Sequence, residues 1–148
     1  MHGGWEANFA VIEPHVGTIV PTEEFEWVRT LAERYLQGCS PLLEQRIRTS
    51  MVIDGHGDLL AEEIFCLPDG PRILDCLAFD ERLRHGDCLD DLAFLVMDVE
   101  RFGGMEAAPA LTRWYREFSY ETHPGSLAHH YVAHRANVRA KIACLRHP

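Results

Sequence analysis

A run of extended-type sequence between long helical patterns constrains the fold of this 148-residue chain more than any other feature. The apolar runs at residues 64–67 and 72–74 are separated by Pro68-Asp69-Gly70-Pro71, a combination typical of a tight turn. We therefore predict a β-hairpin at this point of the chain. It follows the polar loop Gly55-His56-Gly57-Asp58 and ends at Asp75, so it returns Asp75 to the neighbourhood of Asp58.

Helical periodicity flanks this element on both sides. Upstream, a helix is predicted over residues 22–37, and Ser40-Pro41 indicates the start of a second, short helix that runs to about residue 49. The predicted segments that follow are a short strand at residues 51–54 and three helices at residues 88–102, 106–120 and 126–144. Residues 1–21, which contain three glycines and two prolines, are expected to be irregular or extended. We therefore expect an α+β fold that is mostly helical.

The charge balance and the cysteines exclude several classes of protein. The 14 Lys and Arg residues against 23 Asp and Glu residues give a formal net charge of −9, which disfavours a nucleic-acid partner. The sequence has no apolar run of membrane-spanning length and no signal-peptide pattern, so we expect no membrane association. Five cysteines without a Cys-x-x-Cys pair indicate reduced thiols in a cytoplasmic protein.

Three acidic residues around the hairpin have a spacing that suits phosphoryl transfer. Glu63 follows Asp58 by five residues, and Asp75 follows it by seventeen. Phosphoryl transfer needs one carboxylate that accepts the proton of the attacking hydroxyl, and others that hold the magnesium ions neutralising the transferred phosphate. For Glu63, a solvated position in a first helical turn is an equally good interpretation.

The same residues resemble a known family. The order His56-Gly57-Asp58, Glu63 and Leu74-Asp75 looks like the catalytic loop and metal-binding strand of the aminoglycoside phosphotransferase-like branch of the protein-kinase-like fold. The later Gly86-Asp87-Cys88-Leu89-Asp90-Asp91-Leu92-Ala93 is also similar to that family. Residues 54–84 and 129–146 resemble an uncharacterised bacterial subgroup of it. The resemblance covers most of residues 22–148 and implies the C-terminal lobe of a kinase-like enzyme, with the hairpin carrying its catalytic and metal loops.

The resemblance implies roles for four residues. Asp58 is expected to be the catalytic base that deprotonates a small-molecule hydroxyl, and His56 to brace the loop by hydrogen bonding. Asp75 is expected to be the principal ligand of Mg²⁺, with ATP as the phosphate donor. Glu63 stands where the family usually has Asn; a carboxylate still suits Mg²⁺, although it adds negative charge near the nucleotide phosphates.

The sequence also departs from the family. Kinase-like enzymes place a Gly-rich loop and a β-strand Lys before the catalytic loop, whereas the only lysine here is Lys141. We therefore expect an isolated lobe, with weak or undetectable turnover by itself. Its expected partner is a missing N-terminal lobe, or a second copy bound through an exposed apolar face. The alternative is a non-catalytic binding or regulatory remnant.

Several other polar residues carry competing interpretations. Asp87 and Asp91 are expected to cap and anchor the helix beneath the loop. A metal hydrolase is a third hypothesis, and His129, His130 and His134 are weighed as a metal site against a structural helix. The arginines at 82, 84, 135 and 139 are expected to be solvated or ion-paired, with one of them available for a phosphate.

Overall fold

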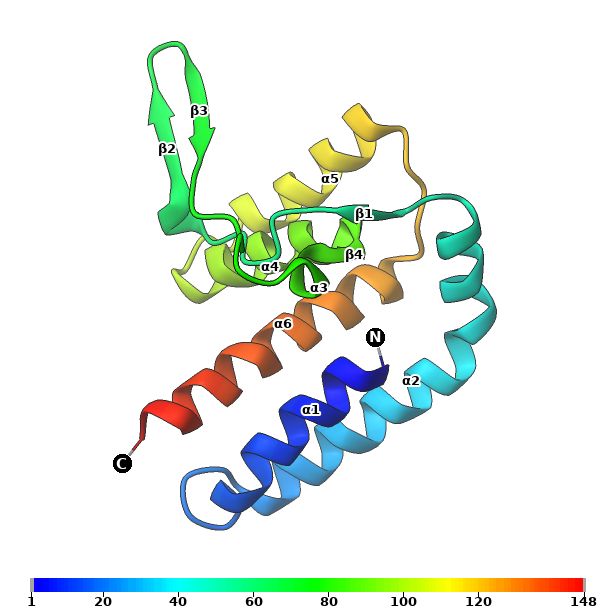
Figure 1. Cartoon of the computed structure of the whole chain (residues 1–148), viewed down its shortest axis with the longest axis vertical. Helices are drawn as coiled ribbons and strands as arrows, with labels where there is room; N and C mark the ends of the chain where they lie inside the picture. The colour runs from blue at the N-terminus through cyan, green and yellow to red at the C-terminus, as the bar shows by residue number, and fades with distance from the viewer. Residues whose placement is uncertain (1, 148) are drawn as a thin grey trace.

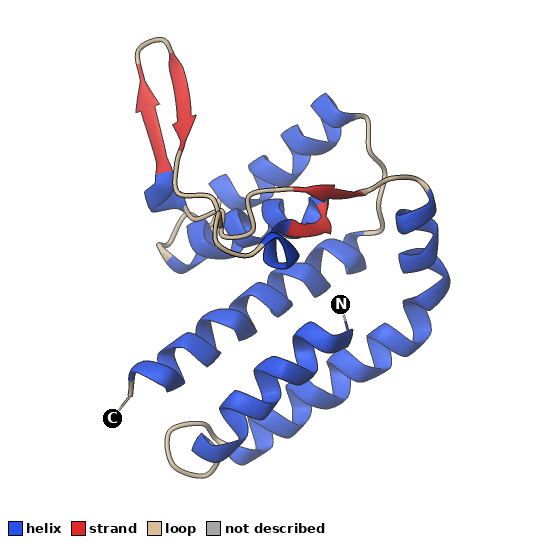
Figure 2. Cartoon of the chain, in the orientation of Figure 1, coloured by secondary structure: helices blue, strands red, loops and turns tan. Residues whose placement is uncertain are grey.

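The computed structural model describes residues 2–147, so Met1 and Pro148, the outer ends of the two predicted segments, lie outside the described residues. The fold is α+β and mostly helical, as the sequence patterns predicted (Figure 2). Its elements in chain order are α1 (His2–Ile12), α2 (Thr22–Arg48), β1 (Val52–Asp54), β2 (Ile64–Leu67), β3 (Gly70–Ile73), α3 (Glu81–Arg84), β4 (His85–Asp87), α4 (Cys88–Arg101), α5 (Ala107–Ser119) and α6 (Gly125–Arg146). Short 3₁₀ helices cover Glu13–His15 and Ala61–Glu63.

Two helices form the centre of the molecule. α4 packs on α6, while α5 covers α4 and α1 covers α6 (Figure 1). The interface of α4 with α6 buries Leu89, Ala93, Leu127 and Tyr131. Leu89 and Ala93 lie on the apolar side of a helix that the periodicity predicted, whereas for α6 the sequence indicated a helix without a distinct apolar face.

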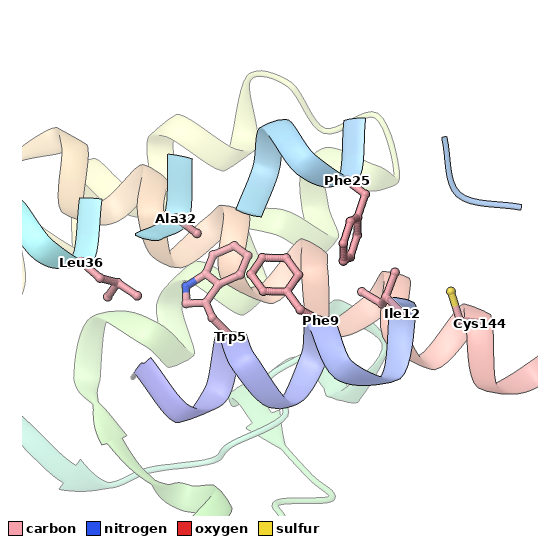
Figure 3. Packing of buried hydrophobic residues seen from close by; sticks show 7 residues of the cluster. All are labelled: Trp5, Phe9, Ile12, Phe25, Ala32, Leu36 and Cys144. Atoms are coloured by element: carbon pink, nitrogen blue, oxygen red, sulfur yellow. The ribbon is translucent and has the colours of Figure 1, made fainter. Parts of the chain in front are cut away.

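The prediction that residues 1–21 are irregular or extended is wrong for their first part, because His2–Ile12 is a helix. Trp5, Phe9 and Ile12 recur at helical spacing and are buried against Phe25 and Leu36 of α2 (Figure 3). Burial of large apolar side chains stabilises the segment by more than the cost of its two glycines, about 1 kcal/mol each.

The two helices predicted over residues 22–49 are one continuous helix, α2, with Pro41 inside it. Pro41 has no N–H for the preceding turn, and α2 bends in its second half (Figure 1). Both halves stay helical because each contributes to the core: Leu36 packs in the cluster with α1, and Leu42 packs against the α4–α6 interface.

The predicted hairpin is confirmed as β2 and β3, which pair antiparallel with Leu67 opposite Gly70. It stands out from the helical body (Figure 1), and the apolar side chains Phe65, Leu67 and Ile73 are exposed on it. The strand β1 is also confirmed, but its partner β4 lies in a segment that was expected to be a charged loop. Alternation of apolar and polar residues cannot be recognised over only three residues, so the sequence pattern did not indicate this strand.

A buried ion-pair network joins three distant segments. Arg46, near the end of α2, donates to both carboxylate oxygens of Asp87, with Nη2 2.7 Å from Oδ1, and its Nη1 lies 2.5 Å from Oε1 of Glu121. Glu121 also contacts Nδ1 of His123 at 2.9 Å. The Asp87 carboxylate accepts in addition from the backbone N–H of Leu89, as the predicted cap of α4.

Replacing Arg46 by alanine leaves two buried carboxylates without their cation, so we expect Arg46→Ala to lower the free energy of unfolding by about 3–5 kcal/mol. Arg48→Ala is the matched control, since this side chain on the same helix is 70% exposed and should change stability by less than about 0.5 kcal/mol. Chemical denaturation of both variants measures the difference, and equal losses would contradict the proposed importance of the network.

The contact of α1 with α6 predicts a pH dependence. Nε2 of His130 accepts from the indole N–H of Trp5 at 3.3 Å, and burial, helped by the nearby His134, lowers the pKa of His130 from 6.5 to about 4. The folded state therefore binds this proton less readily than the unfolded state, so the stability from this group is present above pH 6.5 and is lost as the pH falls to about 4. We expect the melting temperature of His130→Gln to fall less over this range than that of the wild type. His129→Gln, at the exposed neighbouring position, should behave like the wild type.

Candidate functional site

The loop at residues 55–58 is held by one carboxylate from the first turn of α4. Oδ2 of Asp91 accepts from the backbone N–H of His56 at 2.6 Å, and Oδ1 accepts from that of Gly57 at 2.8 Å. On the other side of the loop, the N–H of Gly55 donates to the carbonyl of Arg84 at 3.1 Å. The predicted anchoring role of Asp91 is thus confirmed, and the loop is fixed on both sides.

Both glycines of this loop are required by their surroundings. A Cβ atom at Gly55 would lie 2.2 Å from Oδ2 of Asp91. Gly57 has a φ of +84°, and a Cβ atom there would lie 2.9 Å from the carbonyl oxygen of Leu83. A side chain at Gly55 would push the loop away from α4, and one at Gly57 would collide with the backbone of α3.

Asp58 follows these anchored residues and is half-buried. Burial raises the pKa of its carboxyl group, the positive charges of Arg139, Arg135 and His56 act against that rise, and the negative charge of Asp75 adds to it. The hairpin returns Asp75 toward this loop, because the carbonyl of the preceding residue, Leu74, lies 2.8 Å from Nε2 of His56. No described residue donates a hydrogen bond to the Asp58 carboxylate, so its oxygens are available to a donor from outside the chain.

Asp75 is exposed at the end of the hairpin and has a φ of +60°, in the left-handed region that Asp tolerates better than most residues. His56 braces the chain on either side of it. Its Nε2 lies 2.8 Å from the carbonyl of Leu74, and its own carbonyl accepts from the N–H of Leu77 at 3.1 Å. Because a carbonyl only accepts, Nε2 carries the proton, and the bracing role predicted for His56 agrees with this geometry.

Glu63 lies at the neck of the hairpin. Its carbonyl accepts from the N–H of Leu74 at 3.0 Å, one step beyond the pair of Ile64 with Ile73. The backbone of Glu63 is therefore aligned with the residue before Asp75. Among residues 2–147, no group of three His, Cys, Asp or Glu side chains converges as a metal site.

Two further side chains hold the segment around Asp58, and the sequence patterns did not predict these contacts. Asp98 of α4 is fully buried and accepts from the N–H of Ala61 at 3.0 Å, which holds the segment between Asp58 and Glu63. Arg135 of α6 donates from Nη1 to the carbonyl of Gly57 at 3.0 Å. The available signal for Asp98 was its place four residues after Phe94 on an apolar helix face, where a carboxylate needs donors.

The three histidines of α6 point to different surroundings. His130 stacks on Tyr35 with ring centroids 4.3 Å apart, and Nδ1 of His134 lies 3.7 Å from Asp90. His129 lines a cavity between α5 and α6 instead. His130 therefore takes part in aromatic packing, and His134 lies beside Asp90 within the fold.

A cavity of about 700 Å³ adjoins Asp58. Its walls come from α1, the α3–β4 segment, the first turn of α4 and the second half of α6. Arg139 and Lys141 of α6 both line it, together with Asn8 of α1. The α1 helix that the sequence analysis missed is thus part of the wall of the candidate site.

Comparison with known proteins gives relatives without a described activity. The chain is 37% identical over 142 residues to uncharacterized proteins of Mycobacterium bovis and Mycobacterium tuberculosis. The match covers 96% of this chain and 28% of each relative, so the chain spans little more than a quarter of the length of the curated relatives it matches. No protein-family profile and no solved structure matches it.

Among residues 2–147, no helix combines the length and the apolar composition that a membrane span requires.

Loss of the Asp91 carboxylate should release the loop at residues 55–58. We expect Asp91→Ala to lower the free energy of unfolding by about 1–3 kcal/mol, because two backbone donors lose their acceptor. Compared with the wild type, the variant should show a larger increase in amide hydrogen exchange at His56 and Gly57 than elsewhere in the protein. Glu100→Gln, which changes an exposed carboxylate of the same helix, is the control and should leave both amides protected. Unchanged protection in Asp91→Ala would show that other contacts hold the loop.

Proposed function

We propose that this chain is the catalytic-loop lobe of an aminoglycoside phosphotransferase-like, protein-kinase-like enzyme that phosphorylates a small-molecule hydroxyl. The observation that carries the proposal is the arrangement of Asp58. Its loop is fixed by Asp91, its carboxylate is half-buried with no donor among the described residues, and Asp75 lies near it. A raised pKa makes Asp58 a stronger base than an ordinary aspartate at neutral pH.

The proposed step is a transfer of the γ-phosphoryl group of ATP. The acceptor oxygen forms a bond to the γ-phosphorus while the bond from that phosphorus to the bridging oxygen breaks, and ADP leaves with the bonding electron pair. The hydroxyl proton passes to the carboxylate of Asp58. His56 keeps Asp58 and the end of the hairpin together through its contact with the Leu74 carbonyl, so base and metal ligand stay in one place.

The proposal includes a magnesium ion that is shared with a nucleotide, and the carboxylates of Asp75 and Glu63 are of the type that holds this ion. Protein sites for Mg²⁺ usually supply one or two carboxylates, and substrate phosphates complete the coordination. Asp75 and Glu63 lie on either side of the hairpin neck and are assigned this role. When bound, the ion neutralises charge on the transferred phosphate.

The contacts to the nucleotide base and to the α- and β-phosphates are assigned to a segment outside this chain. Kinase-like enzymes take them from a Gly-rich loop and a lysine that precede the catalytic loop, and neither is found before His56. We therefore propose low turnover for this chain alone, and full activity only with the complementing lobe.

A second candidate is a non-catalytic binding module. The observation that favours it is the protruding hairpin, where Phe65, Leu67, Ile73 and Leu74 are each about half exposed. Such side chains suit a docking surface for a complementing lobe or a partner protein. In this case the acidic residues contribute to the fold or to recognition, and no magnesium-dependent nucleotide binding occurs.

Calorimetric titration with Mg²⁺ and ATP at millimolar concentration separates the two candidates. The enzyme predicts saturable binding that Asp75→Asn abolishes, because the principal carboxylate for the ion is lost. Asp69→Asn, in the exposed turn of the same hairpin, is the matched control and should bind like the wild type. Absence of magnesium-dependent binding in the wild type would favour the non-catalytic module.

Asp58→Asn should separate function from stability. Because burial raises the pKa of Asp58, the ionised group destabilises the folded state, and this cost is fully present when the pH is above the raised value. We therefore expect the variant to melt at the same temperature as the wild type or higher at pH 7, while phosphoryl transfer in the complemented enzyme falls at least a hundredfold. A lower melting temperature would indicate that Asp58 serves the fold instead.

A further inference from the structure

Three cations without an ion-pair partner among residues 2–147 line the same cavity as Asp58. Arg139, Lys141 and Arg146 line it from the second half of α6. No residue in the described part of the chain forms an ion pair or a hydrogen bond with these three side chains. Other arginines of the cavity are neutralised, Arg84 by Asp54 and Arg135 by Asp90.

The acidic residues of the cavity compensate only part of this positive charge. Asp87 pairs with Arg46, Asp90 with Arg135, and Asp91 is occupied by the backbone N–H groups of the loop. Only the carboxylate of Asp58 faces the cavity without a hydrogen-bond donor among the described residues. A local excess of positive charge in a chain of net charge −9 selects an anion at this place and repels anions from most of the remaining surface.

A buried amide from α1 provides an independent indication of a ligand. Asn8 of α1 lines the cavity and is 3% exposed, yet its Nδ2 donor has no hydrogen-bond partner among the described residues. Buried donors are nearly always satisfied, and an unsatisfied one costs about 1–3 kcal/mol. An acceptor oxygen of a bound anion would supply the missing partner.

We propose that the acceptor is a small anionic hydroxyl compound, whose phosphate or carboxylate group is bound by Arg139, Lys141, Arg146 and Asn8 while its hydroxyl lies at Asp58. The assignment of the hydroxyl rests on the proposed function, whereas the anion site stands on the cavity alone. Arg139 is the cation with the strongest effect on Asp58, and Arg146 lies about 10 Å further along α6. This length suits a compound of sugar size, and the excess positive charge of the cavity argues against a cationic aminoglycoside.

Four sugars that differ mainly in charge test the site in the absence of nucleotide: glucose 6-phosphate, gluconate, glucose and glucosamine. Calorimetry at low ionic strength should show saturable binding of the two anions, at least tenfold tighter than glucose or glucosamine. The ratio of the dissociation constants of the two anions then distinguishes a preference for phosphate from a preference for carboxylate. Arg139→Gln should weaken the binding of both anions at least tenfold, and Asn8→Leu should also weaken the binding of both. Arg116→Gln, which removes the same charge from the exposed surface of α5, should change the affinity for either anion less than twofold.

The outcomes separate this inference from the proposed function. Equal affinity for glucose and glucose 6-phosphate, or wild-type affinity in Arg139→Gln with an unchanged melting temperature, overturns the anion site even if phosphoryl transfer occurs. Displacement of bound glucose 6-phosphate by Mg²⁺ and ATP assigns the cations to the nucleotide, and overturns the acceptor site. Anion binding without any magnesium-dependent nucleotide binding overturns the proposed function and leaves the anion site intact.

Discussion

Three carboxylates at the start of α4 hold the other parts of the molecule in place. Asp87 binds Arg46 at the end of α2, Asp90 binds Arg135 of α6, and Asp91 binds two amides of the loop at residues 55–58. The positive end of the helix dipole stabilises negative charge at these positions. Since these contacts all start from one helical turn, the position of Asp58 is set by the same element that organises the core.

The candidate site combines a firmly held part with a more exposed one. Asp58 follows a loop that is bound to α4 and, through Arg135, to α6. Asp75 belongs to a hairpin that protrudes from the body, and His56 connects it to that loop. Elements with few buried contacts open more easily than the core. In the proposed enzyme, this arrangement suits a base that stays fixed beside the cavity and a proposed metal ligand that adjusts to a nucleotide and the complementing lobe.

Much of the site could be predicted from the sequence, because it depends on local signals. The Pro-Asp-Gly-Pro turn located the hairpin, and the positions of Asp58 and Asp75 around it indicated that the hairpin returns Asp75 toward the loop. Long-range contacts could not be predicted in this way. Glycines concealed α1, whose helix is stabilised by packing of Trp5 on other helices, and Pro41 suggested a break that core contacts on both sides of it prevent. The cavity wall that α1 and α6 share was hidden for the same reason.

The most direct test is an NMR titration of the Asp58 carboxyl group, with and without Mg²⁺. The account predicts a pKa above the ordinary value of 3.8, because the group is half-buried beside Asp75. It also predicts that Mg²⁺ lowers this pKa in the wild type and leaves it unchanged in Asp75→Asn, since the ion is held by the neighbouring carboxylate. A pKa at or below the ordinary value, with no response to Mg²⁺, would contradict the pairing of a base with a metal ligand at this site.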